Sequence, residues 1–222
     1  IVSRDWSSDV CSSDLNMVEF FFPTPIYSTE IKNPEFNKIQ EEFKTIYNDL
    51  LDKDKFQYDR GRITQFLNKD PFNGNILKEY DTPVFTKQLH YHIKRYVCEI
   101  NDIKEKREEV IELNWPYKYE IKSSWMTLNK KGMYALAHNH AYADISGCYY
   151  YKTNSRDGNI MFHNPNTLLN TSLLFRHIDN ALQFTPEEGN LILFPGWIQH
   201  SVLTNNTDDD RVSISFNVYF ER

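Results

Sequence analysis

Three histidines and an arginine in the second half of the chain have the types and spacing of a metal site beside an anion-binding residue. His138 and His140 stand one residue apart in H-N-H-A-Y-A-D, just before a run of small and aromatic residues that is typical of a buried strand. In extended backbone, residues i and i+2 point to the same side, so these two imidazoles can converge on one ion. We predict that both are metal ligands at a strand end.

A third ligand is available far downstream, in G-N-L-I-L-F-P-G-W-I-Q-H. An apolar strand is predicted over Leu191–Phe194, Pro195–Gly196 turn the chain, and His200 begins the next strand. After an acidic loop, the alternating stretch R-V-S-I-S-F-N-V-Y-F places Arg211 and two serines on one face of a further strand. The pattern predicts paired histidines, a distant histidine and an arginine around one site.

Further motifs accompany these residues in a fixed order: F-P-T-P-I-Y, W-x-x-x-N, H-x-H followed by S-G-x-Y-Y, G-x-L-x-L-F-P-x-x-x-x-H and R-x-S-x-S-F-N. In this order the chain resembles the 2-oxoglutarate- and Fe(II)-dependent oxygenases, most closely a group found in marine bacteria and phages. The resemblance runs from about Phe22 to Phe220. Each motif is weak alone, whereas their order and spacing together are specific.

The resemblance implies an enzyme that uses Fe(II) as its metal and 2-oxoglutarate as its co-substrate, which is converted to succinate and CO₂. It assigns the catalytic metal to His138, His140 and His200. Hydroxylation of a small molecule, or of a peptide or protein side chain, is the reaction that it implies by default.

The second metal ligand departs from the commoner pattern of this family. Most members have H-x-D or H-x-E and bind iron through two histidines and a carboxylate. Here His140 occupies the carboxylate position, and Asp144 follows in the next loop. We favour His140, because its i, i+2 geometry with His138 needs no rearrangement of the loop. Asp144 stays open as the alternative second ligand.

Five residues are candidates for binding the co-substrate. The planar guanidinium of Arg211 matches a carboxylate in two hydrogen bonds, so the resemblance assigns it the distal carboxylate of 2-oxoglutarate. Ser213 and Ser215 share its face, and Tyr150 can reach the same carboxylate from across the barrel. Asn129 either binds the keto-acid end or the prime substrate, or it satisfies a turn. The alternative for Arg211 is a surface residue that closes the acidic loop before it.

Two other functions stay open on the sequence. One is a three-histidine, cupin-like iron dioxygenase that does not use 2-oxoglutarate, in which Arg211 binds the substrate or nothing. The other is a non-catalytic jelly-roll binding protein. Dependence on 2-oxoglutarate through Arg211 would separate the 2-oxoglutarate-dependent oxygenase from the cupin-like dioxygenase. A bound redox-active metal would separate both enzymes from the binding protein.

Composition bounds the class of protein. The chain has 222 residues, 40% of them hydrophobic and 15% aromatic, which fits one domain with one sizeable core. It has no long apolar run that predicts a membrane span. A net charge of −6 disfavours a nucleic-acid partner, so we expect a small-molecule or peptide substrate. The three cysteines are odd in number and unevenly spaced, which favours an intracellular, cytoplasmic location.

Residues 1–16 are interpreted as a non-native tail. The stretch Asp5–Leu15 has no periodicity and resembles translated sequencing-adapter DNA, which indicates a gene assembled from environmental DNA. It lacks the basic start and apolar centre of a secretory signal. We expect Met17 to be the natural start and residues 17–222 to form a single jelly-roll domain.

The expected fold is α+β and mainly β: a double-stranded β-helix, or cupin-like jelly roll, with N-terminal helices buttressing one sheet. Helical periodicity predicts helices from Asn33–Pro34 and from Thr82–Pro83 to about Ile103, within a supporting region at about 33–105. The β core at about 115–220 has short strands separated by turn residues. They are predicted at residues 117–129, 133–137, 145–153, 159–163, 173–176, 182–185, 190–195, 200–204 and 212–220.

Two further features complete the expectations. Val18–Ile31 contains two prolines and is predicted to form an edge strand, at which a homodimer could pair. His90 and His92 repeat the H-x-H spacing but lie in the second predicted helix. Helical residues two apart point about 200° apart, so this pair is not expected to share an ion.

Overall fold

The computed structural model describes residues 24–52, 57–58, 65–66, 74–101, 115–166, 173 and 180–221. The predicted tail at residues 1–16 lies outside the described residues, as does the start of the predicted edge strand up to residue 23. Most of the strand predicted at 173–176 also lies outside them, and Leu173 itself is in a turn.

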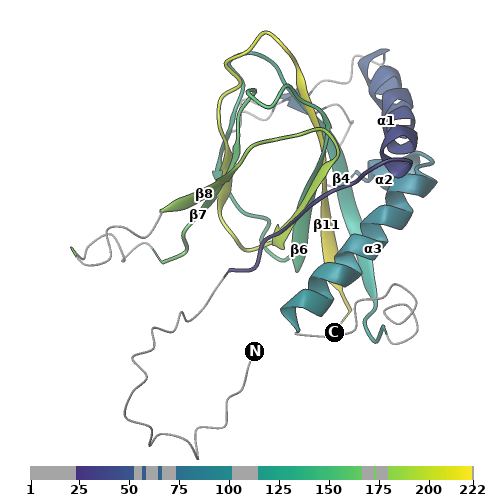
Figure 1. Ribbon diagram of the computed structural model, residues 1–222, viewed down its shortest axis with the longest axis vertical. Helices are drawn as coiled ribbons and strands as arrows, with labels where there is room; N and C mark the ends of the chain where they lie inside the picture. Colours follow the sequence, from purple (N-terminus) through teal and green to yellow (C-terminus); the bar gives the residue numbers. More distant parts are fainter. Residues whose placement is uncertain are drawn as a thin grey trace, which may run out of the picture.

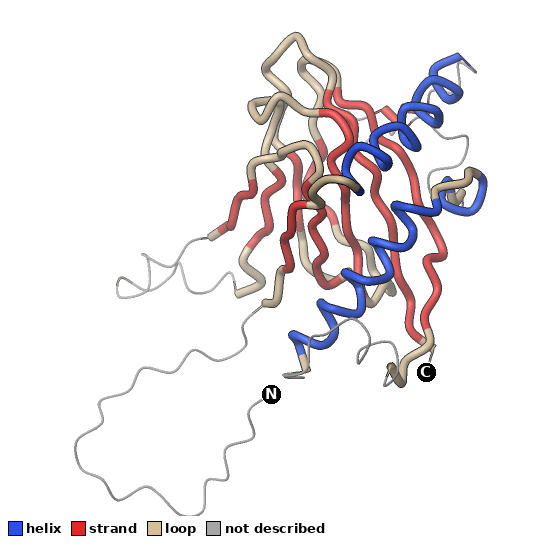
Figure 2. The backbone as a smooth tube through the Cα atoms, turned by 45° about the vertical axis from the view of Figure 1, so that its right-hand side comes forward, coloured by secondary structure: helices blue, strands red, loops and turns tan. Residues whose placement is uncertain are grey.

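Two antiparallel sheets face each other, and the helices cover the outer side of the larger one (Figures 1 and 2). The helices are α1 (Glu35–Asp52), α2 (Ile76–Glu79) and α3 (Pro83–Ile100). The large sheet has the order β1 (Tyr27–Glu30), β9 (Asn190–Pro195), β6 (Ile145–Lys152), β11 (Arg211–Phe220), β4 (Tyr119–Asn129), β3 (Gln65–Phe66) and β2 (Gln57–Tyr58). The small sheet has the order β5 (Ala135–His138), β10 (His200–Val202), β7 (Ile160–His163) and β8 (Ala181–Phe184).

The strands from β4 onward cross repeatedly between the two sheets. β4, β6, β9 and β11 lie in the large sheet, and β5, β7, β8 and β10 lie in the small one. This is the winding of a double-stranded β-helix, so the predicted fold class is confirmed. Each strand of such a fold has one face toward the space between the sheets, which is where alternating residues of distant strands meet.

Strand β6 shows how the alternation separates the hydrophobic core from the inner space. Tyr149 points to the helices, where its ring centroid lies 5.6 Å from that of Phe43 in α1 and 5.2 Å from that of Phe85 in α3. All three side chains are fully buried, and burial of each phenylalanine ring contributes about 1.5–3 kcal/mol. The next residue, Tyr150, points the other way, into the space between the sheets. The helices therefore hold the large sheet from outside and leave its inner face for the site.

The predicted elements agree with the structure except near chain reversals. The helices α1 and α3 are confirmed, and β1 is the last strand on its side of the large sheet, as predicted. β5 begins two residues later than predicted and extends to His138. The short strands β2 and β3 were not predicted, because two residues are too few to give a periodic signal in the sequence.

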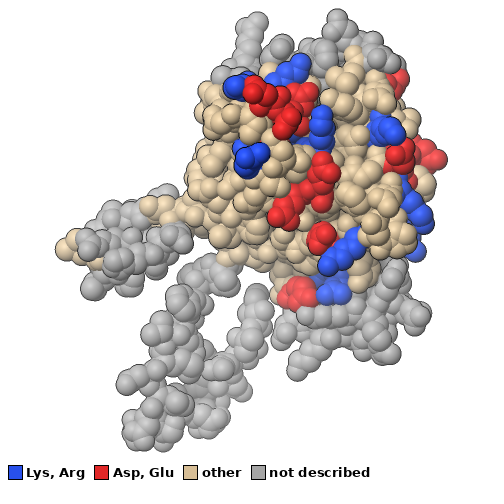
Figure 3. All heavy atoms as spheres, turned by 45° about the horizontal axis from the view of Figure 1, so that its top comes forward, with Lys and Arg blue, Asp and Glu red and all other residues tan. Residues whose placement is uncertain are grey.

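The helices and the surface charges of the described residues are relevant to membrane and nucleic-acid partners. None of the described helices combines the length and apolarity that a membrane crossing requires. On the face shown in Figure 3, acidic and basic side chains are interspersed among uncharged ones. Charged side chains of opposite sign contact each other across the fold, for example Lys131 and Asp208 at 2.8 Å. Such exposed pairs contribute little to stability.

Candidate metal centre

A β-bulge in β5 aims His138 into the space between the sheets. His138 pairs with His200 and Ala135 pairs with Val202, so β5 has two residues where β10 has one. In a regular strand Ala135 and His138 would face opposite sides, because they are three positions apart. With the extra residue both line the same pocket. The bulge therefore re-aims the histidine, as bulges beside functional sites commonly do.

His140 lies in the loop just beyond β5, and a contact between two loops holds its backbone. Its backbone N–H donates to the carbonyl oxygen of Gly196 at 2.8 Å, and the Gly196 N–H donates to the carbonyl oxygen of Asp144 at 3.3 Å. The loops are so close that a Cβ atom at Gly196 would lie 2.2 Å from the carbonyl oxygen of Ala143. The glycine thus allows the His140 loop to lie against the turn that leads to His200.

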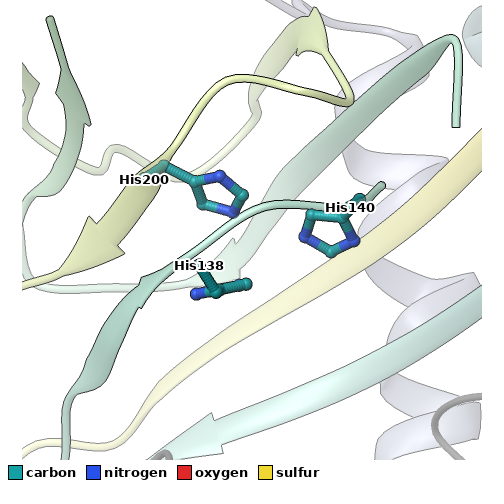
Figure 4. Close-up of side chains that lie close together, drawn as sticks. All are labelled: His138, His140 and His200. Carbon is teal, nitrogen blue, oxygen red and sulfur yellow. The ribbon is translucent and has the colours of Figure 1, made fainter. Parts of the chain in front are cut away.

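The three imidazoles face one another (Figure 4). The ring centroid of His200 lies 4.3 Å from that of His138 and 5.1 Å from that of His140, and the latter two are 5.3 Å apart. One nitrogen from each ring belongs to a cluster in which all candidate ligand atoms lie within 4.8 Å of one another. Three imidazoles are a donor set that suits iron, nickel, copper or zinc.

Hydrogen bonds orient two of the rings. Nδ1 of His138 lies 2.7 Å from the carbonyl oxygen of Leu136, and Nδ1 of His200 lies 3.1 Å from that of Ile198. A carbonyl oxygen only accepts, so each Nδ1 carries the proton and each Nε2 keeps a lone pair. Metal-binding histidines are commonly held in this way, which sets both tautomer and ring orientation.

Asp144, the alternative second ligand, makes a different contact. Its side chain is exposed, and its carboxylate accepts a hydrogen bond from the backbone N–H of Phe220 at 2.8 Å. The candidate metal group found in the described part of the chain consists of the three histidines and does not include Asp144. The geometry therefore supports His140 as the second ligand, which stays a prediction.

The inner face of the large sheet carries rows of polar side chains across β4, β11 and β6. The register of these strands aligns Trp125 with Ser215 and Cys148, Thr127 with Ser213 and Tyr150, and Asn129 with Arg211. All of these residues line one pocket together with the three histidines. The structure thus brings Asn129, Tyr150, Arg211, Ser213 and Ser215 to the same pocket as the candidate ligands, as expected from their alternation.

Arg211 lies inside the pocket with part of its guanidinium unsatisfied. Its side chain is 3% exposed, and Nη1 donates to the carbonyl oxygen of Gly158 at 2.6 Å. Among the residues that the structure describes, it forms no ion pair, and its buried Nε has no hydrogen-bond partner. The alternative of a surface arginine is therefore wrong. A carboxylate ligand would supply both the opposite charge and the missing hydrogen-bond acceptor for this buried guanidinium.

The other polar groups near Arg211 are uncharged at neutral pH. Burial raises the pKa of the Tyr150 hydroxyl well above its usual range and the pKa of the Cys148 thiol to about 11. The Ser213 hydroxyl lies 2.7 Å from that of Thr127. The carbonyl oxygen of Asn129, beside Arg211, accepts a hydrogen bond from Asn205 at 2.9 Å. Arg211 consequently supplies the fixed positive charge of this end of the pocket.

The pocket is partly open to solvent, and the space of about 630 Å³ between its lining atoms includes solvent at its mouth. Phe194, Ile160 and Val202 give it apolar walls. No aspartate or glutamate is among the described residues that line it. The side chain of Phe194 is buried in the pocket wall, whereas Trp197 is 53% exposed on its loop.

The remaining described histidines have hydrogen-bond partners outside the triad. His90 bonds the Tyr119 hydroxyl at 2.7 Å and His92 the Tyr27 hydroxyl at 2.8 Å, both from helix α3. His163 bonds the Ser201 hydroxyl at 3.0 Å. The expectation that the helical pair does not share an ion agrees with these separate contacts.

Two contributions to the site were missed in the sequence. The indole of Trp125 stacks on the ring of His140, and the carbonyl oxygen of Gly158 accepts the hydrogen bond from Arg211. The strand alternation had placed Trp125 on the same face as Asn129, which was the available signal for its position. No local pattern marks Gly158, because its contact joins residues far apart in the chain.

Comparison with known proteins was made against families, curated proteins and solved structures. Residues 123–217 match a family described as “Putative 2OG-Fe(II) oxygenase”. This segment contains most of β4, the strands β5 to β10 and most of β11, including all three histidines and Arg211. No significant match to a curated protein is found.

Solved structures similar to this chain share its fold at low sequence identity. A Pseudomonas putida prolyl-4-hydroxylase aligns with a TM-score of 0.54 and 13% identity, covering 90% of this chain and 93% of that one. A Trichoplax adhaerens prolyl hydroxylase in complex with a hypoxia inducible factor peptide aligns with a TM-score of 0.54 and 11% identity over 87% and 83%. HygX from Streptomyces hygroscopicus, with nickel and 2-oxoglutarate bound, aligns with a TM-score of 0.52 and 12% identity over 88% and 83%.

Proposed function

We propose that this chain is a 2-oxoglutarate- and Fe(II)-dependent oxygenase that hydroxylates a small molecule or a peptide or protein side chain, and the match of residues 123–217 to an oxygenase family supports this. The observation that carries this proposal is the shared pocket of three convergent imidazoles and a buried, incompletely bonded arginine. We assign the iron to His138, His140 and His200 and the distal carboxylate of 2-oxoglutarate to Arg211.

The residues present fit both groups. The Nδ1 hydrogen bonds of His138 and His200 leave their Nε2 lone pairs available for a metal, and the open Nε of Arg211 can donate to a carboxylate. When bound, Fe(II) supplies the activation of dioxygen, with 2-oxoglutarate oxidised to succinate and CO₂ while one oxygen atom is inserted into a substrate C–H bond.

The other residues position the reactants and exclude water. Ser213 and Tyr150 are register neighbours one row from Arg211, so their hydroxyl groups can donate hydrogen bonds to the carboxylate that Arg211 binds. Ser215 lies one row further along β11, beside Trp125, and we assign its hydroxyl to the same co-substrate. Asn129 lies opposite Arg211 and is available to the keto-acid end or to the prime substrate. The apolar side chains of Phe194, Ile160 and Val202 form part of the pocket wall and reduce the access of water on that side, which would limit unproductive oxidation.

The class of substrate and the state of assembly belong to this proposal. One of the similar structures is a prolyl hydroxylase in complex with a peptide, which supports a peptide among the candidate substrates. The net charge of −6 supports a small-molecule or peptide substrate over nucleic acid. The odd number and uneven spacing of the three cysteines support a cytoplasmic location. The outer edge of β1 supports a homodimer by strand pairing.

Anaerobic titration with Fe(II) and then 2-oxoglutarate tests the proposal. Chelation by the keto acid produces a weak visible charge-transfer band, which we expect in the wild-type protein and not in His200→Ala. His163→Ala is the matched control, because this histidine bonds Ser201 outside the triad. Iron binding without the band would exclude use of 2-oxoglutarate, and absence of iron binding would exclude the metal assignment.

A further inference from the structure

The indole of Trp125 lies flat against His140, the ligand that departs from the commoner pattern. The two ring centroids are 5.6 Å apart and the planes are 16° from parallel. The rings of His140 and His200 are also close to parallel, with an interplanar angle of 8° and a centroid distance of 5.1 Å, and Figure 4 shows them side by side. The indole of Trp125 is therefore the aromatic ring that packs on the His140 imidazole from β4.

His140 differs from the other two ligands in how it is supported. His138 and His200 lie in paired strands, and each donates its Nδ1–H to a carbonyl oxygen two residues earlier. His140 lies in the loop beyond β5, where the bond from its backbone N–H to Gly196 fixes the chain. The face of Trp125 packs on the imidazole itself and so limits rotation of this ring about its side-chain torsions.

Trp125 is itself held rigidly enough to serve as a platform. It is 7% exposed and lies in the middle of β4, which pairs with β11 along its whole length. Its register partner is Ser215, a small residue that leaves room for the indole in the space between the sheets. A large ring on a central strand loses little further freedom when a second ring packs on it.

The chemistry of the stack favours an imidazole over a carboxylate. An imidazole bound to a divalent ion carries part of its positive charge, and the face of an indole carries negative charge. The same indole face gives no such stabilisation to a carboxylate, which would meet it with charge of the same sign. The presence of Trp125 thus accounts for histidine at a position where a carboxylate is commoner.

We propose that Trp125 is a positioning residue that holds the ring of His140 for metal binding and makes histidine the matched ligand there. The proposal rests on the proposed function, because it takes His140 as a ligand. It predicts that Trp125 affects the affinity for the metal only when residue 140 is a histidine.

Anaerobic Co(II) titration of four proteins tests this dependence: wild type, Trp125→Leu, His140→Asp and the double variant. We expect Trp125→Leu to raise the Kd for Co(II) about tenfold when residue 140 is histidine, as for other residues that orient a ligand. In the His140→Asp protein the same change should alter the Kd by less than about twofold, because the indole then has no imidazole to hold and the effects of two contacting residues are not additive. Trp125→Phe, which keeps a smaller aromatic face, should give an intermediate Kd.

Two controls separate positioning from loss of fold. Trp197→Leu removes an exposed tryptophan three residues before His200 and should leave the Kd unchanged. In the metal-free protein, the NMR signals of the His140 ring protons should show the ring-current shift of a stacked indole, and Trp125→Leu should abolish it. An equal loss of Co(II) affinity in both residue-140 backgrounds, or no loss in either, overturns the positioning role while leaving the proposed function standing. Failure of wild type to bind Co(II) overturns both.

Discussion

Arg211 and Asp144 are both charged residues at strand ends, and burial separates what they can do. The guanidinium of Arg211 is enclosed in the pocket, where water competes little and an opposite charge is strongly favoured. The carboxylate of Asp144 is exposed and already accepts a backbone N–H. At the scale of single residues, the pocket therefore has one strong anion-binding group, and the co-substrate assignment depends on it.

Arg211→Gln should weaken 2-oxoglutarate binding. The glutamine amide keeps a hydrogen-bond donor and much of the volume but loses the charge and the planar fork of the guanidinium. A hydrogen bond to a charged group contributes about 1.5–3 kcal/mol to binding. We expect a rise of about 10- to 100-fold in the Kd for 2-oxoglutarate, read from the charge-transfer band. Arg156→Gln is the control, because this exposed arginine is not among the residues that line the pocket. Equal affinities for the two variants would contradict the role of Arg211.

At the scale of elements, the site depends on how the ends of strands are joined. The bulge in β5 turns His138 inward, and the loop after β5 lies against the turn between β9 and β10. Gly196 is the point of closest approach of these two loops. The positions of His140 and His200 are therefore coupled through backbone contacts rather than through their own side chains.

Gly196→Ala should impair metal binding more than it impairs folding. The new Cβ atom would lie 2.2 Å from the carbonyl oxygen of Ala143, so the loops must separate and move His140 away from His200. We expect at least a tenfold rise in the Kd for Co(II), the size of effect seen when ligands lose their orientation. Gly132→Ala is the control, since it strains a turn with a φ of +84° but meets no atom within 4 Å. Similar Co(II) affinities for both variants would show that the loop contact does not position the ligands.

Helix α3 is joined to strand β1 by the hydrogen bond between His92 and Tyr27, and this contact should make stability depend on pH. Burial, with a smaller contribution from Arg95, lowers the pKa of His92 from 6.5 to about 4. The folded protein thus favours the neutral ring. Its contribution to stability is complete above pH 6.5 and is lost as the pH falls toward 4.

Between pH 7 and pH 5, the free energy of unfolding of the metal-free protein should fall by about 2 kcal/mol more in wild type than in His92→Gln. Urea unfolding at several pH values measures this difference. His90→Gln is the control, because it removes a histidine–tyrosine bond from the same helix and should keep the steep pH dependence of wild type. Parallel curves for wild type and His92→Gln would rule out this linkage.

At the scale of the whole molecule, the core and the candidate site lie on opposite faces of the large sheet. The main core cluster joins α1 and α3 to residues such as Tyr149, Ile214 and Phe216, and none of the three histidines belongs to it. The fold therefore has its own source of stability. Metal and co-substrate should add to that stability without being required for it.

Ligand removal tests this separation. A saturating ligand that binds only the folded state stabilises it by about 2.7 kcal/mol at a concentration of 100 Kd. For a chain of this size we expect Tm to rise by about 5–10 °C with Fe(II) under anaerobic conditions, and chelator to return it to the metal-free value. Circular dichroism of the chelated protein should keep its sheet and helix signals, and His200→Ala should show no rise in Tm. Unfolding on chelation would instead make the metal structural.

The sequence by itself determined the properties that depend on local periodicity. The two-residue repeat of β11 placed Arg211, Ser213 and Ser215 on one face, and the turn at Pro195–Gly196 placed His200 at a strand start. Helical spacing located α1 and α3, and the order of the motifs indicated a resemblance to the 2-oxoglutarate- and Fe(II)-dependent oxygenases. These signals need only neighbours in the chain, because backbone geometry alone sets which way successive side chains point.

The tertiary structure decided what depends on partners far apart in the chain. The burial of Arg211 excluded its surface reading, and the exposure of Asp144 weakened its claim to the metal. The bulge opposite β10, the contact at Gly196 and the stack of Trp125 on His140 all require the register between strands. Register is set by packing across the whole sheet, so no local pattern in the sequence contains it.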